Sequence, residues 1–580
     1  MIATMPLMFK LVTGRTTEQG RSMEIEGKFG EGYRKAVAIA EMNPKDIEAL
    51  GIKNNAKIIS VYGSIVVNVK PNNDVPPGIV FVPMGPWANV LTLPITEGTG
   101  MPSLKNVDVY VEATSEEATP LDAIFRFLGA EKINYKITER SLTTGIKKVV
   151  HDVPCTFCGE VCDFLSVELD GEKTVRVVNA CPIGHAKFMN YYKHRVLTPM
   201  IRTVKNGNFI EVDLEYAIDR AAEILANAKY PLIYGLSNTC VEATELAVEL
   251  AEITRGVVDN TTTLCHGPTV LAVQEVGTVR ITLGMAMNLA DTIVFWGCNP
   301  MNAHINHIRR VVLPGGKFVK GRKERKIIVI DVRRSDTAKL ADIFIQIEPG
   351  KDYELFTALR MALRDYEIES PKVAGVPREE VYKLVEVMKT AKFGVIFFGM
   401  GLTQGGAKYK NLEEVIRLVQ ELNEWTKWTL LPMRGHYNVT GSNHAMLWLT
   451  GYPYGVEFSR GFPKMIPGVT TTIDLLINSD VDAALIIASD PVAHFPQKAV
   501  ENLMKIPKIV IDPFWSLTAS VADILIPSAV TGIECEGTVY RLDDVPLKVK
   551  RLVDPPKGVL CDTEILSRLI NRVKKLKRLT

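Results

Sequence analysis

The sequence predicts a multidomain α/β protein in which a β-rich N-terminal domain precedes two Rossmann-like halves. Three observations predict this. The chain has 580 residues, which is more than one hydrophobic core usually supports. Its first ~115 residues contain short runs of alternating apolar and polar residues, which is typical of strands. From about Tyr230 onward, short apolar runs bounded by Gly, Pro or Asp alternate with helical patterns, as in parallel sheets with both faces covered.

In the N-terminal domain, two alternating runs flank Tyr62 and Gly63 and predict a hairpin over residues 56–70. Before it, a short helix is expected, with Asn43 as its cap and Gly51 at its end. The Pro- and Gly-rich residues 76–94 predict loops that shape a surface. We place this domain at residues 1–115 and a polar connector with one short helix at 116–150.

Seven short apolar runs predict the strands of the α/β region. They lie at residues 230–237, 291–298, 326–332, 392–399, 428–434, 482–489 and 507–513. Helical patterns between them include residues 240–256 and 411–425. We assign 151–200 to a cysteine-bearing segment and 201–580 to the α/β domains.

An internal repeat lies in this region: residues 330–345 align without gaps with 511–526. Strand ends in open α/β sheets bind nucleotides, and an acidic residue there accepts hydrogen bonds from ribose or base. The alternative is a structural duplication in which Asp caps turns. No G-x-G-x-x-G occurs, so an ordinary NAD fingerprint is absent. The predicted contacts, from the repeat and the strand ends upstream of each copy, are Asn299, Asp331, Thr337, Asp490, Asp512 and Thr518.

Composition narrows the function classes. Hydrophobic residues make up 47% and charged residues 23%, as in ordinary globular proteins. The 68 Lys and Arg nearly balance the 66 Asp and Glu, so bulk charge gives no indication of nucleic-acid binding. The basic residues 317–326 are interpreted as a solvated loop, with a docking patch as the alternative. We expect no signal peptide, no membrane span and a cytoplasmic location, where thiols stay reduced.

Four of the nine cysteines follow the pattern C-x2-C-x3-C-x18-C, at Cys155, Cys158, Cys162 and Cys181. Structural zinc sites more often use two C-x-x-C pairs. Three close ligands and one remote ligand, with Pro182 after the last, favour a [4Fe–4S] cluster. Zinc is the alternative.

Two further motifs indicate a small-molecule site. Cys265 lies on a polar turn directly before His266, where a thiolate can bind a metal or act as a nucleophile; a buried core cysteine is the alternative. That reading as a core residue also applies to Cys240, Cys298, Cys535 and Cys561. Arg434 ends an apolar run and can bind a carboxylate or phosphate, with a surface ion pair as the alternative.

Taken in order, the cysteine pattern, the Cys-His pair and the R-G-x-x-N-V-x-G turn at 434–441 resemble the formate dehydrogenase-like molybdopterin-dinucleotide oxidoreductases. More closely, residues 153–163, 179–188, 263–269 and 434–441 resemble the B-type chain of formylmethanofuran dehydrogenase, an enzyme of archaeal methanogenesis. Residues 43–52, 78–92 and 99–102 resemble its small D-type chain, a dinucleotide-binding β-barrel, expected to be of the double-psi type. The resemblance covers nearly the whole chain, with the D-like part first.

The resemblance implies a bis-molybdopterin guanine dinucleotide cofactor with tungsten or molybdenum, bound by Cys265 and an inorganic sulfide. His266 is implied as the proton or hydride partner, and Arg434 as the residue that holds the carboxylate of formate. Asn438 of the turn and Asn89, in residues 85–92 of the barrel, are implied as cofactor contacts. The cluster would pass electrons to partner subunits. One departure is Ile183, which stands where formate dehydrogenases have a lysine between cluster and pterin; the nearest basic residue is Lys187.

The chain has nine histidines, and no two are spaced as His-x-His, the pair that a dinuclear zinc site of the amidohydrolase type needs. The resemblance therefore implies that a partner subunit with that zinc site condenses formate with methanofuran, alongside C-like and polyferredoxin-type subunits. Two alternatives stand: a stand-alone formate dehydrogenase, and a non-catalytic electron-transfer subunit that lost the pterin.

Overall fold

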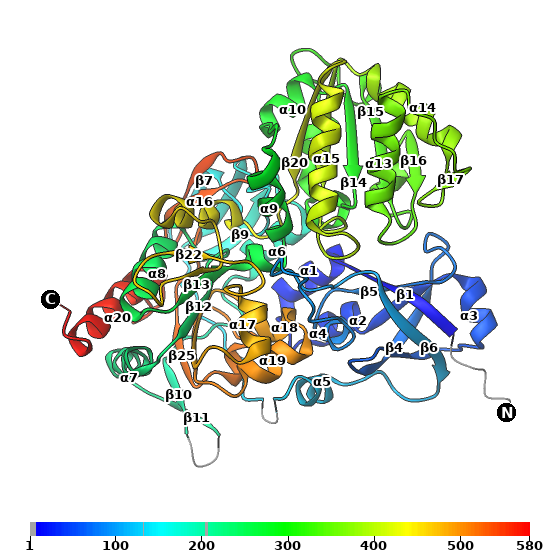
Figure 1. Cartoon of the computed structure of the whole chain (residues 1–580). Coiled ribbons are helices and arrows are strands. Elements are labelled where there is room, and N and C mark those ends of the chain that lie inside the picture. Colours follow the sequence, from blue (N-terminus) through cyan, green and yellow to red (C-terminus); the bar gives the residue numbers. More distant parts are fainter. Residues whose placement is uncertain (1–6, 131–132, 204–206, 580) are drawn as a thin grey trace.

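The computed structural model describes residues 7–130, 133–203 and 207–579. The expectation of no signal peptide concerns the N-terminus, and its first residues, 1–6, lie outside the described residues. Figure 1 shows a barrel, a nine-stranded sheet and a five-stranded sheet, the last at the top of the view. None of the helices in the described ranges has the length and apolarity to cross a membrane.

The N-terminal domain is a closed six-stranded barrel in the order β1-β5-β2-β4-β3-β6. The predicted hairpin is confirmed, because β3 and β4 pair antiparallel with Ile59 opposite Ser64. The predicted helix α3 (Pro44–Leu50) is also confirmed: Asn43 accepts from the Lys45 amide, and Gly51 ends the helix at φ 64°. The strands are β1 (Leu7–Gly14), β2 (Ile39–Met42), β3 (Asn55–Ile59), β4 (Ser64–Pro71), β5 (Ile79–Pro83) and β6 (Val107–Thr114), with helices α1 (Thr17–Glu26), α2 (Glu31–Val37) and α4 (Pro86–Val90).

The nine-stranded sheet has the order β11-β10-β25-β24-β23-β12-β13-β21-β22. Its central strands, β25 to β13, are parallel, and its edges are antiparallel. Helices α7 (Leu214–Asn227), α8 (Val241–Thr254) and α20 (Asp562–Leu576) cover one face. Helices α17 (Thr472–Asn478) and α19 (Gln497–Leu503) cover the other. The strands are β10 (Met200–Arg202), β11 (Phe209–Glu211), β12 (Pro231–Gly235), β13 (Val257–Asn260), β21 (Val456–Glu457), β22 (Lys464–Met465), β23 (Ala483–Ile487), β24 (Lys508–Asp512) and β25 (Ile524–Pro527).

The five-stranded sheet is parallel throughout, in the order β16-β15-β14-β19-β20, and is inserted between β13 and β21. Helices α13 (Asp352–Leu363), α14 (Arg378–Lys389) and α15 (Tyr409–Leu422) pack on one face, and α10 (Leu283–Leu289) on the other. The strands are β14 (Thr292–Trp296), β15 (Lys326–Asp331), β16 (Ile343–Gln346), β19 (Phe393–Phe398) and β20 (Lys427–Pro432). All seven predicted α/β strands are confirmed, but the chain distributes them over two interleaved sheets.

The internal repeat forms the same structure twice. Ile328 of β15 lies opposite Ile343 of β16, and Ile509 of β24 lies opposite Ile524 of β25. A short 3-10 turn joins the strands in each copy, at Ala338–Leu340 and Ala519–Val521. Each sheet therefore presents the same strand end and the same turn.

The cysteine segment forms a small antiparallel sheet of β7 (Lys147–Val153), β8 (Leu165–Asp170) and β9 (Lys173–Val178), followed by α6 (Pro182–Asn190). The β7–β8 loop carries three of the predicted ligands, and Cys181 caps α6. The connector contains the expected helix, α5 (Leu121–Phe127). The other elements are α9 (Gly267–Val276), α11 (Pro300–Ala303), α12 (Ile305–His307), α16 (Val439–Thr450), α18 (Pro491–His494), β17 (Lys372–Val373), β18 (Val376–Pro377), β26 (Gly537–Tyr540) and β27 (Pro546–Val549).

The barrel shares its hydrophobic core with the nine-stranded sheet. Buried barrel residues such as Val90 and Leu91 belong to the same cluster as Val500 of α19 and Leu525 of β25. Because apolar surface is buried on both sides of this contact, the barrel is part of the folded body and not a tethered module.

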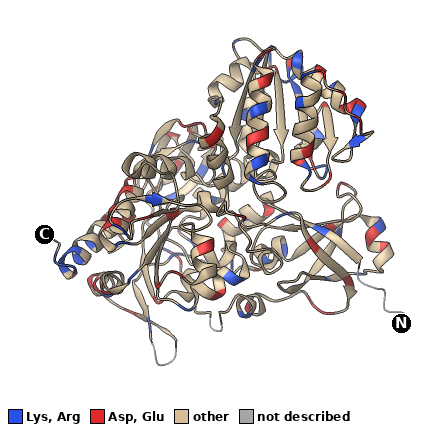
Figure 2. Ribbon diagram, in the orientation of Figure 1, with Lys and Arg blue, Asp and Glu red and all other residues tan. Residues whose placement is uncertain are grey.

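The charged residues show no such grouping. Figure 2 shows acidic and basic residues mixed over the helices rather than gathered by sign.

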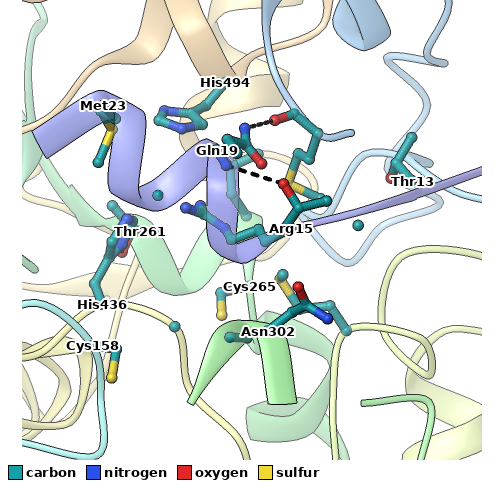
Figure 3. A pocket seen from close by; sticks show the side chains of 18 of the residues that line it. Thr13, Arg15, Gln19, Met23, Cys158, Thr261, Cys265, Asn302, His436 and His494 are labelled. Atoms are coloured by element: carbon teal, nitrogen blue, oxygen red, sulfur yellow. Dashed lines mark hydrogen bonds between the residues drawn. The ribbon is translucent and has the colours of Figure 1, made fainter. Parts of the chain in front are cut away.

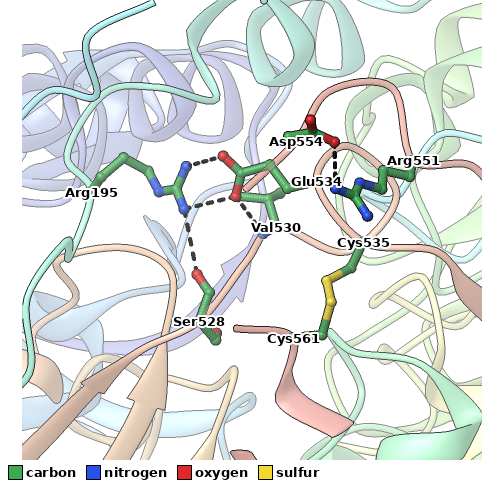
Figure 4. Close-up of a disulfide and its surroundings, with 8 residues drawn as sticks. All are labelled: Arg195, Ser528, Val530, Glu534, Cys535, Arg551, Asp554 and Cys561. Carbon is green, nitrogen blue, oxygen red and sulfur yellow. Dashed lines mark hydrogen bonds and ion pairs between the residues drawn. A yellow bond between two sulfur atoms is a disulfide. The ribbon is translucent and has the colours of Figure 1, made fainter. Parts of the chain in front are cut away.

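Two cysteines that we interpreted as separate core residues are paired: Cys535 and Cys561 form a disulfide (Figure 4). They are separated by 26 residues, so no local spacing indicated the bond. An isolated parallel β-bridge between Ser528 and Leu560 brings the segments of the two cysteines together. Beside the disulfide, the fully buried Arg195 donates to both carboxylate oxygens of Glu534, at 2.6 and 2.8 Å.

Candidate functional site

A cavity of about 420 Å³ lies between the barrel and the carboxyl ends of the parallel strands of both large sheets. It is lined by residues 297–299 after β14, 331–333 at the end of β15, 488–491 after β23 and 512–516 at the end of β24. The barrel contributes residues 12–16. Figure 3 shows Arg15 and Gln19 on one side of this cavity, with Cys265, His436 and Cys158 on the other. Parallel sheets bind ligands at this end of their strands.

Four of the predicted nucleotide contacts line the cavity: Asn299, Asp331, Asp490 and Asp512. Burial raises the pKa of Asp331 and raises that of Asp512 to about 8. Burial therefore disfavours the charge on these carboxyl groups, which a ligand that donates hydrogen bonds would stabilise.

Thr337 and Thr518 do not line the cavity, but they occupy equivalent positions and each contacts a residue that does. The Thr337 hydroxyl donates to the Asn299 amide oxygen at 2.7 Å, and the Thr518 hydroxyl donates to the Asp490 carboxylate at 2.6 Å. Turn capping, the alternative for the repeat, is therefore present. The upstream Asn299 and Asp490 accept from these threonines, and Asp512 of the second copy also accepts from the Phe514 amide at 2.8 Å.

Asn89 and Asn438 do not line the cavity. The Asn89 amide donates to the Ala493 carbonyl at 2.7 Å. The Asn438 amide donates to the Thr239 carbonyl at 2.7 Å, and its oxygen accepts from the Tyr540 amide. Both side chains thus join segments of the chain in this structure, and their roles as cofactor contacts stay predictions.

No sequence pattern indicated several basic side chains that line the cavity, among them Arg15, Lys28, Lys105 and Arg333. Among the described residues, the buried Nε of Arg15 has no hydrogen-bond partner. Burial lowers the pKa of Lys105 to about 7. Lys28 pairs with Asp490 at 2.5 Å. The only local signal was the placement of Arg15 directly after β1; the four residues come from separate segments and form no pattern along the sequence.

Cys265 lines the same cavity and follows the 3-10 turn Thr261–Leu264. Burial raises the pKa of its thiol, while the Gly435 amide and the charge of Arg434 act in the opposite direction. A thiol held beside a backbone N–H and a guanidinium is suited to carry negative charge once a cation is bound.

His266 and Arg434 lie behind Cys265 and do not line the cavity. His266 is fully buried; its Nδ1 contacts the Thr269 hydroxyl at 3.0 Å, and its buried Nε2 has no hydrogen-bond partner among the described residues. Burial, followed by the charge of Arg434, lowers the pKa of His266 to about 3, so the ring is neutral at pH 7.

The Arg434 guanidinium donates Nη1 to Asn443, and its buried Nε has no partner within the described part of the chain. Burial lowers its pKa to about 10, which leaves it charged at pH 7. Its carbonyl accepts from His304 Nε2 at 2.7 Å, which fixes the turn. The structure thus brings Cys265, His266 and Arg434 together, with an unused donor on the arginine.

All four cysteines of the pattern line a second, smaller cavity. Their thiols influence one another: burial, together with the nearby Cys181, raises the pKa of Cys155 to about 12. Within the described ranges, no three His, Cys, Asp or Glu side chains are grouped closely enough to hold a single metal ion. Four soft ligands around one buried space fit an iron–sulfur cluster by their chemistry.

The two cavities share a wall formed by Phe157, Cys158, Ile183 and Ala303. Ile183, which by the resemblance stands at the position of a lysine, is therefore part of this wall, and Lys187 lines the larger cavity but not the smaller one. The Gly159 amide donates to the Gly435 carbonyl at 3.1 Å. A Cβ on Gly159 would lie 2.3 Å from the Arg434 carbonyl oxygen, so only glycine allows this close approach.

Two family matches agree with this geometry. Residues 195–572 match the molybdopterin oxidoreductase family, and residues 9–108 match the molydopterin dinucleotide binding domain. The chain therefore belongs to the molybdopterin oxidoreductases, and the predicted fold class is confirmed at that level. It is 50% identical over 432 residues to the B-type chain of the tungsten-containing formylmethanofuran dehydrogenase 2 of Methanocaldococcus jannaschii, covering 74% of this chain and 99% of that one. The suspected relation to formylmethanofuran dehydrogenase is thereby confirmed, and the chain is an oxidoreductase.

The D-like part has its own relative. Protein FwdD of the same organism is 41% identical over 126 residues, covering 21% of this chain and 94% of that one. B-like and D-like parts therefore occur here in one polypeptide. Among solved structures, a chain of the formyltransferase/hydrolase complex from Methylorubrum extorquens, in complex with methylofuran, shares the fold at a TM-score of 0.53 and 21% identity, covering 65% of this chain and 99% of that one.

Proposed function

We propose that this chain is the redox subunit of a formylmethanofuran dehydrogenase and reversibly reduces CO2 to formate at a tungsten or molybdenum bis-pterin site. The observation that carries the proposal is the position of Cys265. Cys265 lines the large cavity and lies against the Arg434 turn, and this cavity shares a wall with the four-cysteine cavity.

The cavity suits a long dinucleotide cofactor with two similar ends. Basic side chains in its lining, among them Arg15, Lys28, Lys105 and Arg333, would match the charge of phosphates. The repeated strand ends at Asp331 and Asp512 would each accept hydrogen bonds from one guanosine. On this reading the parallel sheets are Rossmann-like halves, and the barrel is of the double-psi type and closes over the pterin.

The residues around Cys265 have distinct roles in this reaction. The bound metal would supply the two-electron chemistry, with Cys265 as its protein ligand. Arg434, whose Nε has no partner in the part of the chain that the structure describes, would hold the carboxylate oxygens and offset the charge that CO2 gains. The neutral His266 would exchange the proton or hydrogen next to Cys265. Electrons would arrive one at a time from a [4Fe–4S] cluster at the four cysteines, across the wall that includes Cys158 and Ile183.

The second half-reaction is assigned to partner subunits. The chain lacks a His-x-His pair, so condensation of formate with methanofuran is proposed for a dinuclear-zinc subunit, reached by an internal path. C-like and polyferredoxin-type subunits would complete a cytoplasmic complex.

The purified, metal-loaded chain is expected to oxidise formate with an artificial electron acceptor, but neither to make nor to hydrolyse formylmethanofuran. Adding the partner subunits should restore formylmethanofuran synthesis, which a stand-alone formate dehydrogenase would not show. Elemental analysis of the same sample should find tungsten or molybdenum. A chain that contains neither metal and no pterin would instead support the electron-transfer alternative, and hydrolysis of formylmethanofuran by the isolated chain would contradict the assigned division of labour.

Replacing a cluster ligand should remove the cluster. Cys155→Ala or Cys181→Ala is expected to abolish the [4Fe–4S] signal in electron paramagnetic resonance (EPR) spectra of the reduced protein, because a cubane missing one thiolate ligand is no longer fully held. Cys240→Ala is the matched control, since Cys240 is a buried free cysteine outside the small cavity. An unchanged spectrum in the ligand variants, or stoichiometric zinc in the parent protein, would refute the assignment.

A further inference from the structure

We propose that Asn306 is a positioning residue that sets the reduction potential of the four-cysteine centre by donating a hydrogen bond to the Cys162 sulfur. The inference rests on the cluster proposed above and adds a residue from outside the cysteine pattern. Asn306 lies in α12, far from Cys162 in the sequence, and lines the small cavity but not the large one. Its action is therefore directed at the cysteines.

The geometry fixes which end of the amide faces the sulfur. Asn306 Nδ2 donates to the Asn179 carbonyl at 3.0 Å. A backbone carbonyl can only accept, so this bond identifies Nδ2 as the nitrogen. The same nitrogen carries a second hydrogen and lies 3.5 Å from Cys162 Sγ. With an exposed fraction of 5%, the amide is largely shielded from solvent.

The charges around Cys162 give this bond its effect. The buried Glu160 lies two residues before Cys162, and the Asn306 amide places an N–H against the Cys162 sulfur. Reduction of a cluster adds negative charge to its sulfurs. A donor at a ligand sulfur therefore stabilises the reduced state and raises the potential. The same amide also joins the Cys162 loop to Asn179, just before Cys181, which holds the two ligand segments together.

The test is a redox titration of the assembled protein followed by EPR. Asn306→Leu removes both donors without adding charge, and Asn306→Asp removes them and adds a carboxyl group. Both variants are expected to have a more negative midpoint potential, with the Leu variant shifted by about tenfold in the equilibrium constant, or about 59 mV for one electron, and the Asp variant by more. The matched control is Asn502→Leu: Asn502 is also 5% exposed and donates to two carbonyls, at 2.8 and 3.0 Å, but touches no cysteine. The midpoint potential of the Asn502→Leu variant should equal that of the parent protein.

Parent potentials in both Asn306 variants would overturn the inference. A parent protein without a [4Fe–4S] spectrum would instead refute the cluster, so the two failures are distinguishable. If the variants do not assemble, the parent labelled with 15N-asparagine gives the answer: pulsed EPR should show a weak nitrogen coupling to the reduced cluster, and its absence would equally overturn the proposal.

Discussion

The Cys265→Ser variant is expected to lose formate oxidation by more than about 100-fold, because exchange of even an outer-shell partner of a metal commonly changes activity 10–100-fold. Serine has nearly the same shape, but its oxygen is a harder ligand than sulfur and changes the potential of a metal that prefers thiolate. The rate with an artificial acceptor and the metal content should be measured on the same sample.

The structure provides a close control for this change. Cys298 also lines the large cavity, but its thiol contacts the Phe397 carbonyl at 3.4 Å rather than the Arg434 turn. Cys298→Ser should keep most of the activity. The EPR spectrum of the four-cysteine centre should be unchanged in both variants, because neither thiol lines the small cavity. Near-normal turnover by Cys265→Ser would remove Cys265 from the site.

Arg434→Lys is expected to lower kcat/KM for formate by about 10²–10³-fold, the usual loss when a preorganised donor to developing charge is removed. The proposed role needs the planar fork of arginine: Nη1 donates to Asn443, and Nε, which has no partner among the described residues, would be free for the substrate. A lysine keeps the charge but cannot make both contacts. Because the contact is proposed to strengthen as CO2 gains charge, kcat should fall as well as KM rise.

A surface arginine separates this effect from a general loss of charge. Arg220 on α7 is half-exposed and pairs only with its helical neighbour Glu223 in the described contacts, so Arg220→Lys should leave kcat/KM unchanged. Unfolding temperatures of both variants should be compared, since Arg434 is buried. A value of kcat/KM near that of the parent in Arg434→Lys would contradict the proposed role.

Local chemistry made much of the molecule predictable. The α/β strands are apolar runs buried on both faces, so each could be found from a few adjacent residues, as with Ile327–Ile330 of β15. The helix α3 was predictable because its cap, Asn43, and its terminating Gly51 are both local signals. One loop carries Cys155, Cys158 and Cys162, and His266 directly follows Cys265. Their spacing along the sequence therefore predicts that each group lies together.

The rest of the site depends on contacts between distant segments, which no local pattern records. Arg15 and Lys28 reach the cavity only because the barrel packs its apolar surface against the nine-stranded sheet. Asn306 finds Cys162, and Cys535 pairs with Cys561, for the same kind of reason. The sequence by itself determined the strands, the cysteine motif and the Cys265–His266 pair, because short-range polarity and spacing specify them. Only the tertiary structure decided which side chains surround them, because burial of apolar surface between the barrel and the sheets places those residues side by side.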